Sequence, residues 1–477
     1  MTFHYSHLDT GCTIKHKILI IPVMKTLSIC LPFIILLSIN CSSGDNNHGR
    51  QSGTEISQGK ISDDSLLTLV QYRTFEYFWD GAEPHSGMAR ERFHVDGIYP
   101  ENDMNVVTSG GSGFGLMAIL TGIERGFITR DEALTRYSKI IDFLKKADRF
   151  HGAWPHWIYG ETGKVKPFSL KDNGADIVET AYLMQGLLTV RQYFINGSDK
   201  EKLLASEIDK LWREVEWSWF TKGGESVLYW HWSPNYGWDM NFAVRGYNEC
   251  LILYILAASS PTFPIQASVY HEGWARSGAI NTLSGKYGYI LTLRHNGAEE
   301  YGGPLFWTHY SYLGLDPRYL KDKYADYWQE NKNQTLINWK WCSLNPDKFV
   351  GYSDSCWGLT ASYSVNGYAA HAPGEVNDLG VITPAAALSS FPYTPEHSMN
   401  AMKHFYYILG NKIWGEYGFF DAFSEQNNWF PQRYLAIDQG PVVIMIENFR
   451  TGFLWNLFMS STDIQNGLKV LGFTSGE

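Results

Sequence analysis

Three carboxylates lie close together in one short part of the chain. Asp172 and Asp176 precede an apolar segment, and Glu179 lies one helical turn inside it. Residues three apart share a face of a helix, so the side chains of Asp176 and Glu179 would point the same way. Hydrolysis of a glycosidic bond needs two carboxyl groups: one protonates the leaving oxygen, and the other activates water or attacks directly. Helix capping by Asp172 and pairing of Asp176 with the helix dipole are structural alternatives, but neither explains Glu179.

A fourth carboxylate, Glu249, lies in the sequence RGYNECLI, which leads into a very hydrophobic segment. A carboxylate in such a place is costly unless it is paired or used. One interpretation is an ion pair with Arg245, four residues earlier. The other is a general acid whose pKa is raised by apolar surroundings. Farther along the chain, Glu447 and Arg450 are expected to form a buried structural pair.

Aromatic residues make up 15% of the chain and include 18 Trp. Two short runs, 154–157 and 230–239, place them beside polar residues, and four aromatics within nine residues are hard to fit into a core. Flat rings bury one face of a sugar while their edges stay wet. We therefore expect these residues to bind substrate: Trp154, His156, Trp157, Trp230, His231, Trp232 and Trp238.

The sequence contains no motif for metal, phosphate or nucleic-acid binding. The histidines lack the spacing of a metal site, so we predict no catalytic metal and no cofactor. The glycine-rich run 110–113 follows no predicted strand, and close helix packing explains it better than phosphate binding. Net charge is −10 without a basic block, which argues against a nucleic-acid partner. The 44% hydrophobic and 18% charged composition is that of a globular protein.

The segments that must position these residues are helical, because helical periodicity predominates from residue 62 to 459. Six segments carry many charges on one side. They begin with clear signals, such as the capping box of Thr129 and Glu132 and Pro395 at the first position of its helix, while Gly410 is expected to end that helix. The six span about 62–79, 129–148, 199–216, 264–275, 319–338 and 394–409.

Six further segments alternate with these and are apolar or small all round, which predicts burial. They begin near Gly110, Gly174, Arg245, Pro304, Pro384 and Gly440. The alternation predicts an all-α fold, an (α/α)6 barrel of six inner and six outer helices in a single large domain, 61–477. In such a barrel the N-termini of the inner helices point to one end, so the polar segments before them would ring one funnel. An irregular α-solenoid is the alternative, although solenoid repeats are shorter and more uniform.

The N-terminal region is expected to be a targeting signal rather than a part of the folded domain. Residues 27–39 form an apolar run that is shorter than the about 20 residues of a membrane span and fits a signal peptide with Lys25 as its positive flank. Cys41 follows directly and resembles the acylated Cys of a lipobox, although Asn40 departs from the usual small residue. An ordinary secretory signal is the alternative.

We therefore expect 1–40 to be a signal region. Within it, Met24 is the expected natural start, and 1–23 would come from a start codon assigned too far upstream. Residues 41–60 are rich in Ser, Gly, Asn and Gln and are expected to be a flexible, lipid-anchored tether. The protein would then be attached to a membrane in the periplasm or at the outer membrane. Of the later cysteines, Cys342 and Cys356 could form a disulfide there, but buried free thiols are equally compatible with the sequence, and Cys250 has no evident partner.

The chain resembles the bacterial glycoamylase-like family over about residues 65–460. The resemblance rests on the sequences TFEYFWDGAEPHSGMARER, TSGGSGFGLMAI, GAWPHW, DNGADIVETAYLMQGLL, VLYWHWSPNYGW, RGYNECLI, YGGPLFWTHYS, FPYTPEHSM and LAIDQGPVVIMIENFRTG. The characterised members of that family are β-1,2-glucanases with an (α/α)6 barrel and are thought to invert the anomeric centre. The resemblance implies the same fold and activity here.

By the same resemblance, Glu249 corresponds to the proposed general acid of the family. Asp176 and Glu179 correspond to its other essential carboxylates, and which carboxylate is the base stays open. Arg90, within the first motif, and Arg245 are also predicted to bind substrate.

Three functions compete at this point. The first is a monomeric hydrolase of β-1,2-glucan, endo-acting or releasing short units such as sophorose. The second is a non-catalytic, surface glycan-binding lipoprotein, and the third is a polysaccharide lyase. Glu179 and Glu249 favour the first, because binding alone needs no carboxylates in apolar segments. A lyase usually has a basic cleft, whereas the predicted funnel is acidic.

Overall fold

The computed structural model describes residues 60–99, 101–374 and 378–475. The chain divides into two units, 1–61 and 62–477, and the fold below is that of the second unit. The predicted signal region, Cys41 and the predicted tether up to residue 59 lie outside the described residues. No helix in the described part of the chain is both long and apolar enough to cross a membrane.

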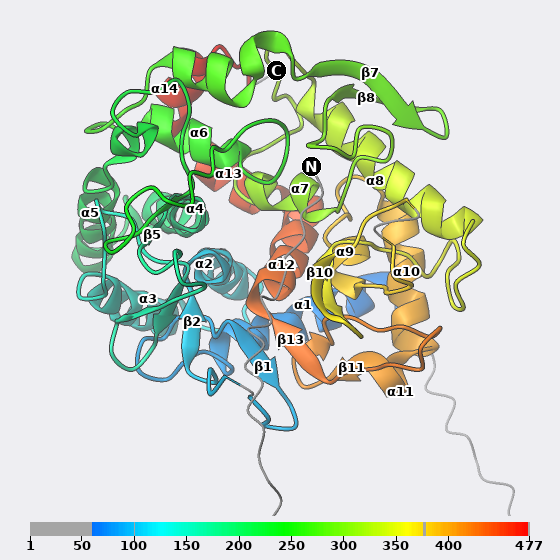
Figure 1. Ribbon diagram of the computed structural model, residues 1–477. Coiled ribbons are helices and arrows are strands. Elements are labelled where there is room, and N and C mark those ends of the chain that lie inside the picture. Colours follow the sequence, from blue (N-terminus) through cyan, green and yellow to red (C-terminus); the bar gives the residue numbers. More distant parts are fainter. Residues whose placement is uncertain (1–59, 100, 375–377, 476–477) are drawn as a thin grey trace, which may run out of the picture. The chain divides into compact units, whose positions relative to one another are not determined.

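Helices make up most of the secondary structure of this unit (Figure 1). Their bounds are α1 Asp63–Trp79, α2 Ser109–Glu124, α3 Arg130–Leu144, α4 Ile177–Phe194, α5 Asp199–Arg213, α6 Leu251–Ser259, α7 Phe306–His309, α8 Tyr327–Leu344, α9 Pro384–Leu388, α10 Pro395–Tyr407, α11 Gly410–Ile413, α12 Ala436–Thr451, α13 Phe453–Met459 and α14 Thr462–Leu471. Short 3-10 segments lie at Trp217–Thr221, Arg276–Gly278 and Tyr310–Tyr312, and a π-helix at Val269–Trp274.

Short strands join the helices, so the described part of the chain is helix-rich with a few small sheets. The strands are β1 Arg92–His94, β2 Val106–Thr108, β3 Trp157–Tyr159, β4 Val165–Lys166, β5 Ala175–Asp176, β6 His231–Trp232, β7 Asn281–Lys286, β8 Tyr289–Leu293, β9 Ala361–Ser364, β10 Gly367–Ala370, β11 Trp414–Gly415, β12 Gly418–Phe419 and β13 Arg433–Leu435. In the described ranges they pair antiparallel as β1–β13, β2–β3–β4, β5–β6, β7–β8, β9–β10 and β11–β12. Buried connections need partners for their backbone groups, and these ladders supply them.

The predicted alternation of buried and exposed helices is present along much of the chain. Almost every residue of α2 and α4 is buried, whereas α3 and α5 bury one face and lie outside them (Figure 1). Helix α2 packs against α4 and α12, α4 packs also against α6, and α12 packs against α9. The described residues are therefore organised around a core of buried helices.

Glycines allow α2 and α4 to approach very closely. A Cβ atom on Gly113 would lie 2.2 Å from the carbonyl oxygen of Tyr182, and one on Gly186 would lie 2.1 Å from the carbonyl oxygen of Gly113. Real Cβ atoms do not come so near to backbone atoms, so only glycine fits at either position. The interpretation of the glycine-rich run as a helix-packing surface is therefore confirmed.

Helix ends were predicted well where local capping fixes them and poorly elsewhere. The capping box of Thr129 and Glu132 is present, and Pro395 is the first residue of α10. The stop at Gly410 is wrong, because α10 ends at Tyr407 and Gly410 begins α11. Four predicted helices are shorter, shifted or different. The segment 264–275 contains the π-helix, the helices expected from Pro304 and Pro384 have 4 and 5 residues, and the helix expected at 319–338 is α8, Tyr327–Leu344.

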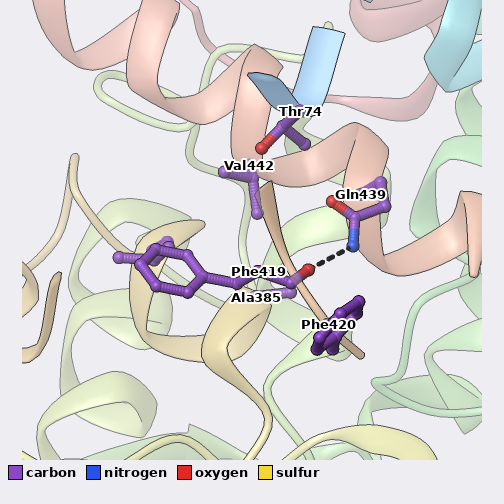
Figure 2. Close-up of a pocket in the computed structure, with 7 residues that line it drawn as sticks. Thr74, Ala385, Phe419, Phe420, Gln439 and Val442 are labelled. Carbon is purple, nitrogen blue, oxygen red and sulfur yellow. Dashed lines mark hydrogen bonds between the residues drawn. The ribbon is translucent and has the colours of Figure 1, made fainter. Parts of the chain in front are cut away.

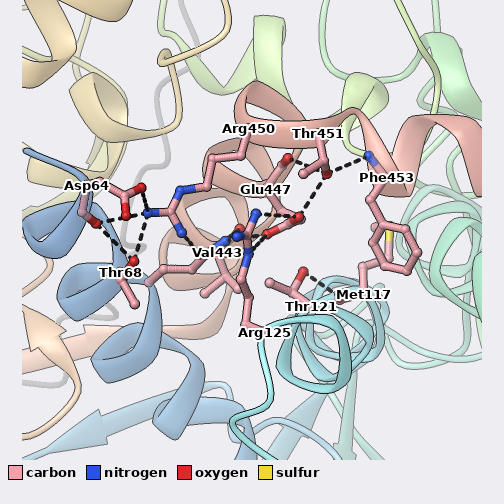
Figure 3. Close-up of polar contacts among 11 residues, drawn as sticks. Asp64, Thr68, Met117, Thr121, Arg125, Val443, Glu447, Arg450, Thr451 and Phe453 are labelled. Carbon is pink, nitrogen blue, oxygen red and sulfur yellow. Dashed lines mark hydrogen bonds and ion pairs between the residues drawn. The ribbon is translucent and has the colours of Figure 1, made fainter.

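The expected pair of Glu447 with Arg450 is also wrong, as Figure 3 shows. Glu447 binds Arg125 of the α2 C-terminus through two hydrogen bonds of 2.6 and 2.8 Å. Arg450 instead donates to the Asp64 carboxylate at 2.7 Å. Both contacts join residues more than 300 positions apart, so local spacing could not have indicated them.

Cys250, Cys342 and Cys356 are buried free thiols. Of the two possibilities left open for Cys342 and Cys356, the structure therefore shows the unbridged one.

Candidate active site

The site is built around the N-terminus of α4. Asp176 is the N-cap of this helix, and its Oδ1 accepts hydrogen bonds from the backbone N–H groups of Val178 (3.0 Å) and Glu179 (2.9 Å). Strand β5 pairs with β6, which places Asp176 opposite His231. The polar segment before α4 and the aromatic run 230–232 are therefore brought together by backbone pairing.

Two histidines contact the carboxylates of this cluster. His156 Nδ1 lies 3.1 Å from Asp176 Oδ2, and His156 Nε2 lies 4.0 Å from Glu179 Oε1. His231 Nε2 lies 3.4 Å from Asp172 Oδ2 and 3.8 Å from Asp176 Oδ2. The sequence placed both histidines in a sugar subsite, but in the structure they also form an electrostatic network with the three carboxylates.

This network sets the protonation states. Burial opposes a charge on His156, but Glu179 and the hydrogen bond with Asp176 outweigh it and raise the pKa of His156 to about 10. Burial likewise disfavours ionised Asp176, but its bond with His156 and the backbone N–H groups keep the pKa of Asp176 below its usual value. At neutral pH the centre therefore holds an imidazolium and a carboxylate side by side.

The two neighbouring carboxyl groups shift the other way. Burial and the charge of Asp176 raise the pKa of Asp172 to about 7, with His156 opposing. Burial also raises the pKa of Glu179 to about 7; His156 lowers it and Asp176 raises it. Carboxyl groups with such pKa values can exchange protons near neutral pH, which is what acid–base chemistry requires.

Gly110 allows Glu179 to reach the N-terminus of α2. The Gly110 N–H donates a hydrogen bond of 2.9 Å to Glu179 Oε2. A Cβ atom at Gly110 would lie 2.4 Å from the same oxygen. The glycine-rich start of α2 thus has two roles: it packs against α4 and it positions a carboxylate.

Glu249 lies in a turn before α6 rather than inside a helix, which corrects the predicted helix start near Arg245. The helix begins at Leu251, after Gly246 adopts φ +79° and Asn248 Oδ1 accepts the N–H of Cys250 at 3.0 Å. Glu249 is partly buried, and burial raises the pKa of its carboxyl group to about 7.

The alternative role for Glu249, an ion pair with Arg245, is not found within the described residues. Arg245 donates instead to the Gly273 carbonyl at 3.4 Å. The backbone carbonyl of Glu249 accepts hydrogen bonds from Tyr182 at 3.3 Å and from Ser311. These bonds fix the turn through the backbone. The carboxyl group itself interacts with its own backbone N–H and with the Cys250 thiol, and both lower its pKa against the larger effect of burial.

The Tyr310 hydroxyl is influenced by carboxylates from three parts of the chain. Burial raises the pKa of its hydroxyl group, and the charges of nearby carboxylates add to the effect. These are Asp438 of α12, Glu179 of α4 and Glu249. The Tyr310 hydroxyl is buried and has no hydrogen-bond partner in the described structure.

A pair of acids near this region was not among the predicted site residues. Asp421 and Asp438 are buried, and one oxygen of each has no hydrogen-bond partner among the described residues. Burial raises the pKa of both, that of Asp421 to about 6, and the two groups influence each other. Asp438 occupies the first turn of the apolar helix α12, much as Glu179 does in α4, so the same signal could have indicated it. Asp421 lies in a loop and carries no such signal.

The predicted sugar-stacking residues fall into two groups. Trp230, Trp232 and Trp238 are partly exposed, and Trp219 packs against the last two with ring centroids 5.4 and 4.7 Å apart. Trp154 is fully buried, and its indole N–H donates to the Leu144 carbonyl at 3.2 Å. Trp154 therefore serves the core, because no ring face is left for a sugar.

Trp157 and Arg90 are also held by the protein itself. Trp157 is buried, with Phe168 at 4.7 Å and the Arg92 guanidinium over its ring. Arg90 donates to the carbonyls of Gly81, Ala82 and Met104 and to the side chain of Asn105. Since these bonds occupy the guanidinium, the structure gives Arg90 a structural role in place of the predicted contact with substrate.

A small hollow lies between residues of α1, α9, β12 and α12 (Figure 2). It has room for about one water molecule. The Gln439 amide donates to the Phe419 carbonyl at 3.0 Å across it. The residues that line it are Thr74, Ala385, Leu388, Phe419, Phe420, Gln439 and Val442. It is too small for a sugar and contains no titratable group.

One group of donors in the site could hold a metal ion. Ligand atoms of His156, Asp172 and Asp176 lie within 4.8 Å of one another. The sequence showed no metal-binding spacing here because His156 comes from another segment, which the Asp176 N–H joins through a hydrogen bond of 3.0 Å to the Trp154 carbonyl. The expected absence of a catalytic metal stays a prediction.

Fold and site together define the class of this protein: a helix-rich scaffold whose buried helices hold several interacting carboxyl groups, suited to acid–base hydrolysis. The chain belongs to the glycoamylase family. The family model described as putative glucoamylase matches residues 241–462.

Solved structures of relatives cover almost all of the described chain. An endo-β-1,2-glucanase from Chitinophaga pinensis, solved with sophorotriose and glucose, is 67% identical, with a TM-score of 0.86 over 87% of this chain and 99% of that one. A putative glucoamylase from Bacteroides fragilis is 61% identical, with a TM-score of 0.86 over 88% and 99%.

A curated relative is an exo β-1,2-glucooligosaccharide sophorohydrolase acting at the non-reducing end, from Parabacteroides distasonis. It is 47% identical over 424 residues, which are 86% of this chain. This chain spans 58% of the length of that relative.

Proposed function

We propose that the protein is a glycoside hydrolase that cleaves β-1,2-glucan by an inverting mechanism with two carboxyl groups. The observation that carries the proposal is that Glu179 and Tyr182 lie one turn apart on α4 and the Tyr182 hydroxyl donates to the Glu249 backbone carbonyl at 3.3 Å. Two carboxyl groups with pKa values raised to about 7 are thereby held by neighbouring segments. The substrate class follows from the relatives whose names specify β-1,2-glucan or its oligosaccharides.

Glu249 is the proposed general acid, because a carboxyl group with a pKa of about 7 keeps its proton close to neutral pH. The base that activates water is one of the carboxylates at the α4 N-terminus. Asp176 is the least suited of these, because both its oxygens already accept hydrogen bonds. Glu179 and Asp172 remain as the acceptors of the water proton, with Asp176 and His156 setting their charge state.

We further propose endo action. The endo-acting relative is 67% identical and covered over 99% of its length, against 47% and 58% for the exo-acting one. Product analysis on β-1,2-, β-1,3- and β-1,4-glucans tests both parts of the proposal. Early release of mixed-length oligosaccharides from the β-1,2-glucan alone is expected, with the α-anomer appearing first by NMR.

Other products would point elsewhere. Sophorose as the sole early product would indicate exo action, and cleavage of another linkage would overturn the substrate. Unsaturated products would indicate a lyase. Tight binding of β-1,2-glucan without any cleavage would support the alternative of a non-catalytic glycan-binding lipoprotein.

The finer architecture belongs to the same proposal. We propose that the helices form an (α/α)6 barrel in one domain, 61–477. The side-by-side order α6, α4, α2, α12 and α9 of the buried helices supports an inner ring, and the contacts of α1, α3 and α5 support an outer one. An endo-β-1,2-glucanase from Talaromyces funiculosus with 11% identity and a TM-score of 0.61 supports likeness in fold alone. A crystal structure without six inner helices would contradict it.

Trp232 is expected to form a sugar subsite in this enzyme. It is partly exposed, and its ring contacts those of His151 and Trp219 on the face of β6 opposite to His231. Replacement by Ala should weaken glucan binding by roughly 1–3 kcal/mol and leave the fold intact. Calorimetric titration of β-1,2-oligosaccharides into the E249Q protein measures this without turnover. Trp339→Ala, at a partly exposed Trp of α8 that stacks on His397, is the matched control and should bind normally. Equal affinity in both variants would remove Trp232 from the site.

For the cellular location we propose a lipid-anchored monomer in the periplasm or at the outer membrane. The apolar run 27–39 followed by Cys41 motivates this. Cys41→Ala should abolish incorporation of a labelled fatty-acid analogue and release the protein from the membrane fraction. Cys342→Ser is the control, since this thiol is buried in the fold. Equal labelling of wild type and C41A would exclude the anchor.

A further inference from the structure

A cysteine, a histidine and a glutamate from three separate segments meet outside the candidate active site. One ligand atom of each of Cys356, His404 and Glu425 lies within 4.8 Å of the others. His404 is part of α10, Cys356 belongs to the loop that precedes β9, and Glu425 lies between β12 and β13. None of the three is used in the proposed hydrolysis.

The three side chains are not engaged with one another or with other described residues in ways that explain the cluster. His404 Nε2 is buried and has no hydrogen-bond partner within the described structure. Cys356 is fully buried and is a free thiol. The Glu425 carboxylate forms no ion pair among the residues that the structure describes. An orphaned ring nitrogen beside a thiol and a carboxylate is costly unless a further group joins them.

The backbone makes room for the carboxylate. Gly351 has φ +93°, and a Cβ atom there would lie 2.3 Å from Glu425 Oε1. Any other residue would therefore displace Glu425 from the cluster. Burial lowers the pKa of His404, so its ring is neutral at pH 7 and its nitrogen can accept a metal.

We propose that Cys356, His404 and Glu425 bind one zinc ion, or a similar borderline-soft divalent metal, at a site that joins α10 to two loops. A thiolate, an imidazole and a carboxylate are all zinc ligands, and a buried thiolate excludes the hard ions Mg²⁺ and Ca²⁺. Zinc with Zn–S about 2.3 Å and Zn–N about 2.0 Å sets tetrahedral ligand atoms about 3.5 Å apart, so small side-chain rotations close the site.

The protonation balance of the binding step is simple. The ion displaces the proton of the Cys356 thiol, which passes to solvent, and binds the neutral His404 ring and the Glu425 carboxylate. A water molecule completes the four ligands. Burial and the charge of Glu425 raise the pKa of Cys356, so without a metal the thiol keeps its proton, and the bound cation reverses that preference.

Cobalt is the direct probe, because Co²⁺ bound to a thiolate gives a charge-transfer band in the near ultraviolet that oxygen and nitrogen ligands do not give. The chelator-treated full chain, kept reduced by a non-thiol reductant without oxygen, is titrated with Co²⁺ alone. One equivalent should develop the band in wild type and in Cys342→Ser, whose thiol is equally buried. Cys356→Ser should abolish the band, and Zn²⁺ should displace it in wild type.

Stability gives a second measurement that hydrolysis does not influence. Zn²⁺ at about 100 times its Kd should raise the Tm of wild type by about 3 °C and leave that of Cys356→Ser unchanged. Ions bound at His156, Asp172 and Asp176 give no thiolate band, so the two clusters are distinguished.

Two outcomes overturn the proposal: no band in folded, reduced wild type at saturating Co²⁺, or a band that survives in Cys356→Ser. If Cys356→Ser does not fold, Co²⁺ binding is measured in His404→Gln and Glu425→Gln instead. Both side chains are partly exposed, so their replacement disturbs the fold less. Each should weaken Co²⁺ binding at least about tenfold, and unchanged binding in both refutes the site.

Discussion

Replacing Glu249 by Gln should lower kcat on β-1,2-glucan by about 10²- to 10⁴-fold, the usual contribution of a general acid. The amide keeps the shape and polarity of the side chain but cannot supply a proton to the leaving oxygen. Since burial raises the pKa of Glu249 to about 7, kcat/KM of the wild type should fall as pH rises through about 7. This alkaline limb should vanish from the residual activity of the variant.

The stability of the same variant gives a second, independent result. A carboxyl group whose pKa is raised in the folded state holds its proton more tightly there, so it opposes folding as pH rises from its unfolded value toward about 7. The amide lacks this effect. Tm of E249Q should therefore match wild type at low pH and equal or exceed it above pH 7.

Glu447→Gln is the matched control, at a buried glutamate that pairs with Arg125. It should reverse the pattern: Tm falls because Arg125 loses its partner, and activity per folded molecule is retained. Loss of stability with retained activity in E249Q would instead show that Glu249 is structural and that the acid lies elsewhere.

The carboxylates of the site were predictable because each breaks a local pattern. Glu179 interrupts an apolar helix, and Glu249 precedes another, so burial of a charge could be read from neighbours in the sequence. Asp421 follows no such pattern, and only its contact with Asp438 in the fold shows that it is part of a buried acid pair. Contacts between residues far apart in the chain cannot be predicted from the spacing of residues along the sequence.

The aromatic composition indicated a sugar site, but it could not show which tryptophans stack on sugars and which are buried in the core. Trp154 and Trp232 stand in similar aromatic-polar runs, yet one is fully buried and the other partly exposed. The difference arises from tertiary packing, because the Trp154 indole reaches the end of α3. Helix starts followed the same rule: the local capping of α3 was predicted, whereas the turn at Gly246 delayed α6 beyond its expected start.

Replacing Asp176 by Asn should abolish most of the activity with little loss of stability. Asn caps helices as well as Asp, so the bonds to the N–H groups of Val178 and Glu179 should persist. What is lost is the charge that helps to raise the pKa of His156 to about 10 and that of Glu179 to about 7. We expect kcat to fall by at least about 10²-fold, because the acid–base groups then leave their working protonation states.

Asp176→Ala removes the cap as well and should cost about 1 kcal/mol of additional stability. Asp326→Asn is the control: Asp326 caps α8 by accepting the Gln329 N–H at 3.1 Å, outside the candidate site. It should leave both kcat and Tm near wild type. Thermal unfolding, kcat and the NMR titration of His156 are measured on the same preparations. The His156 pKa should fall in D176N, so that the ring becomes neutral at a lower pH than in wild type. If D176N keeps full activity while D176A loses it, Asp176 acts only as a helix cap, and the charge network around α4 is not part of the chemistry.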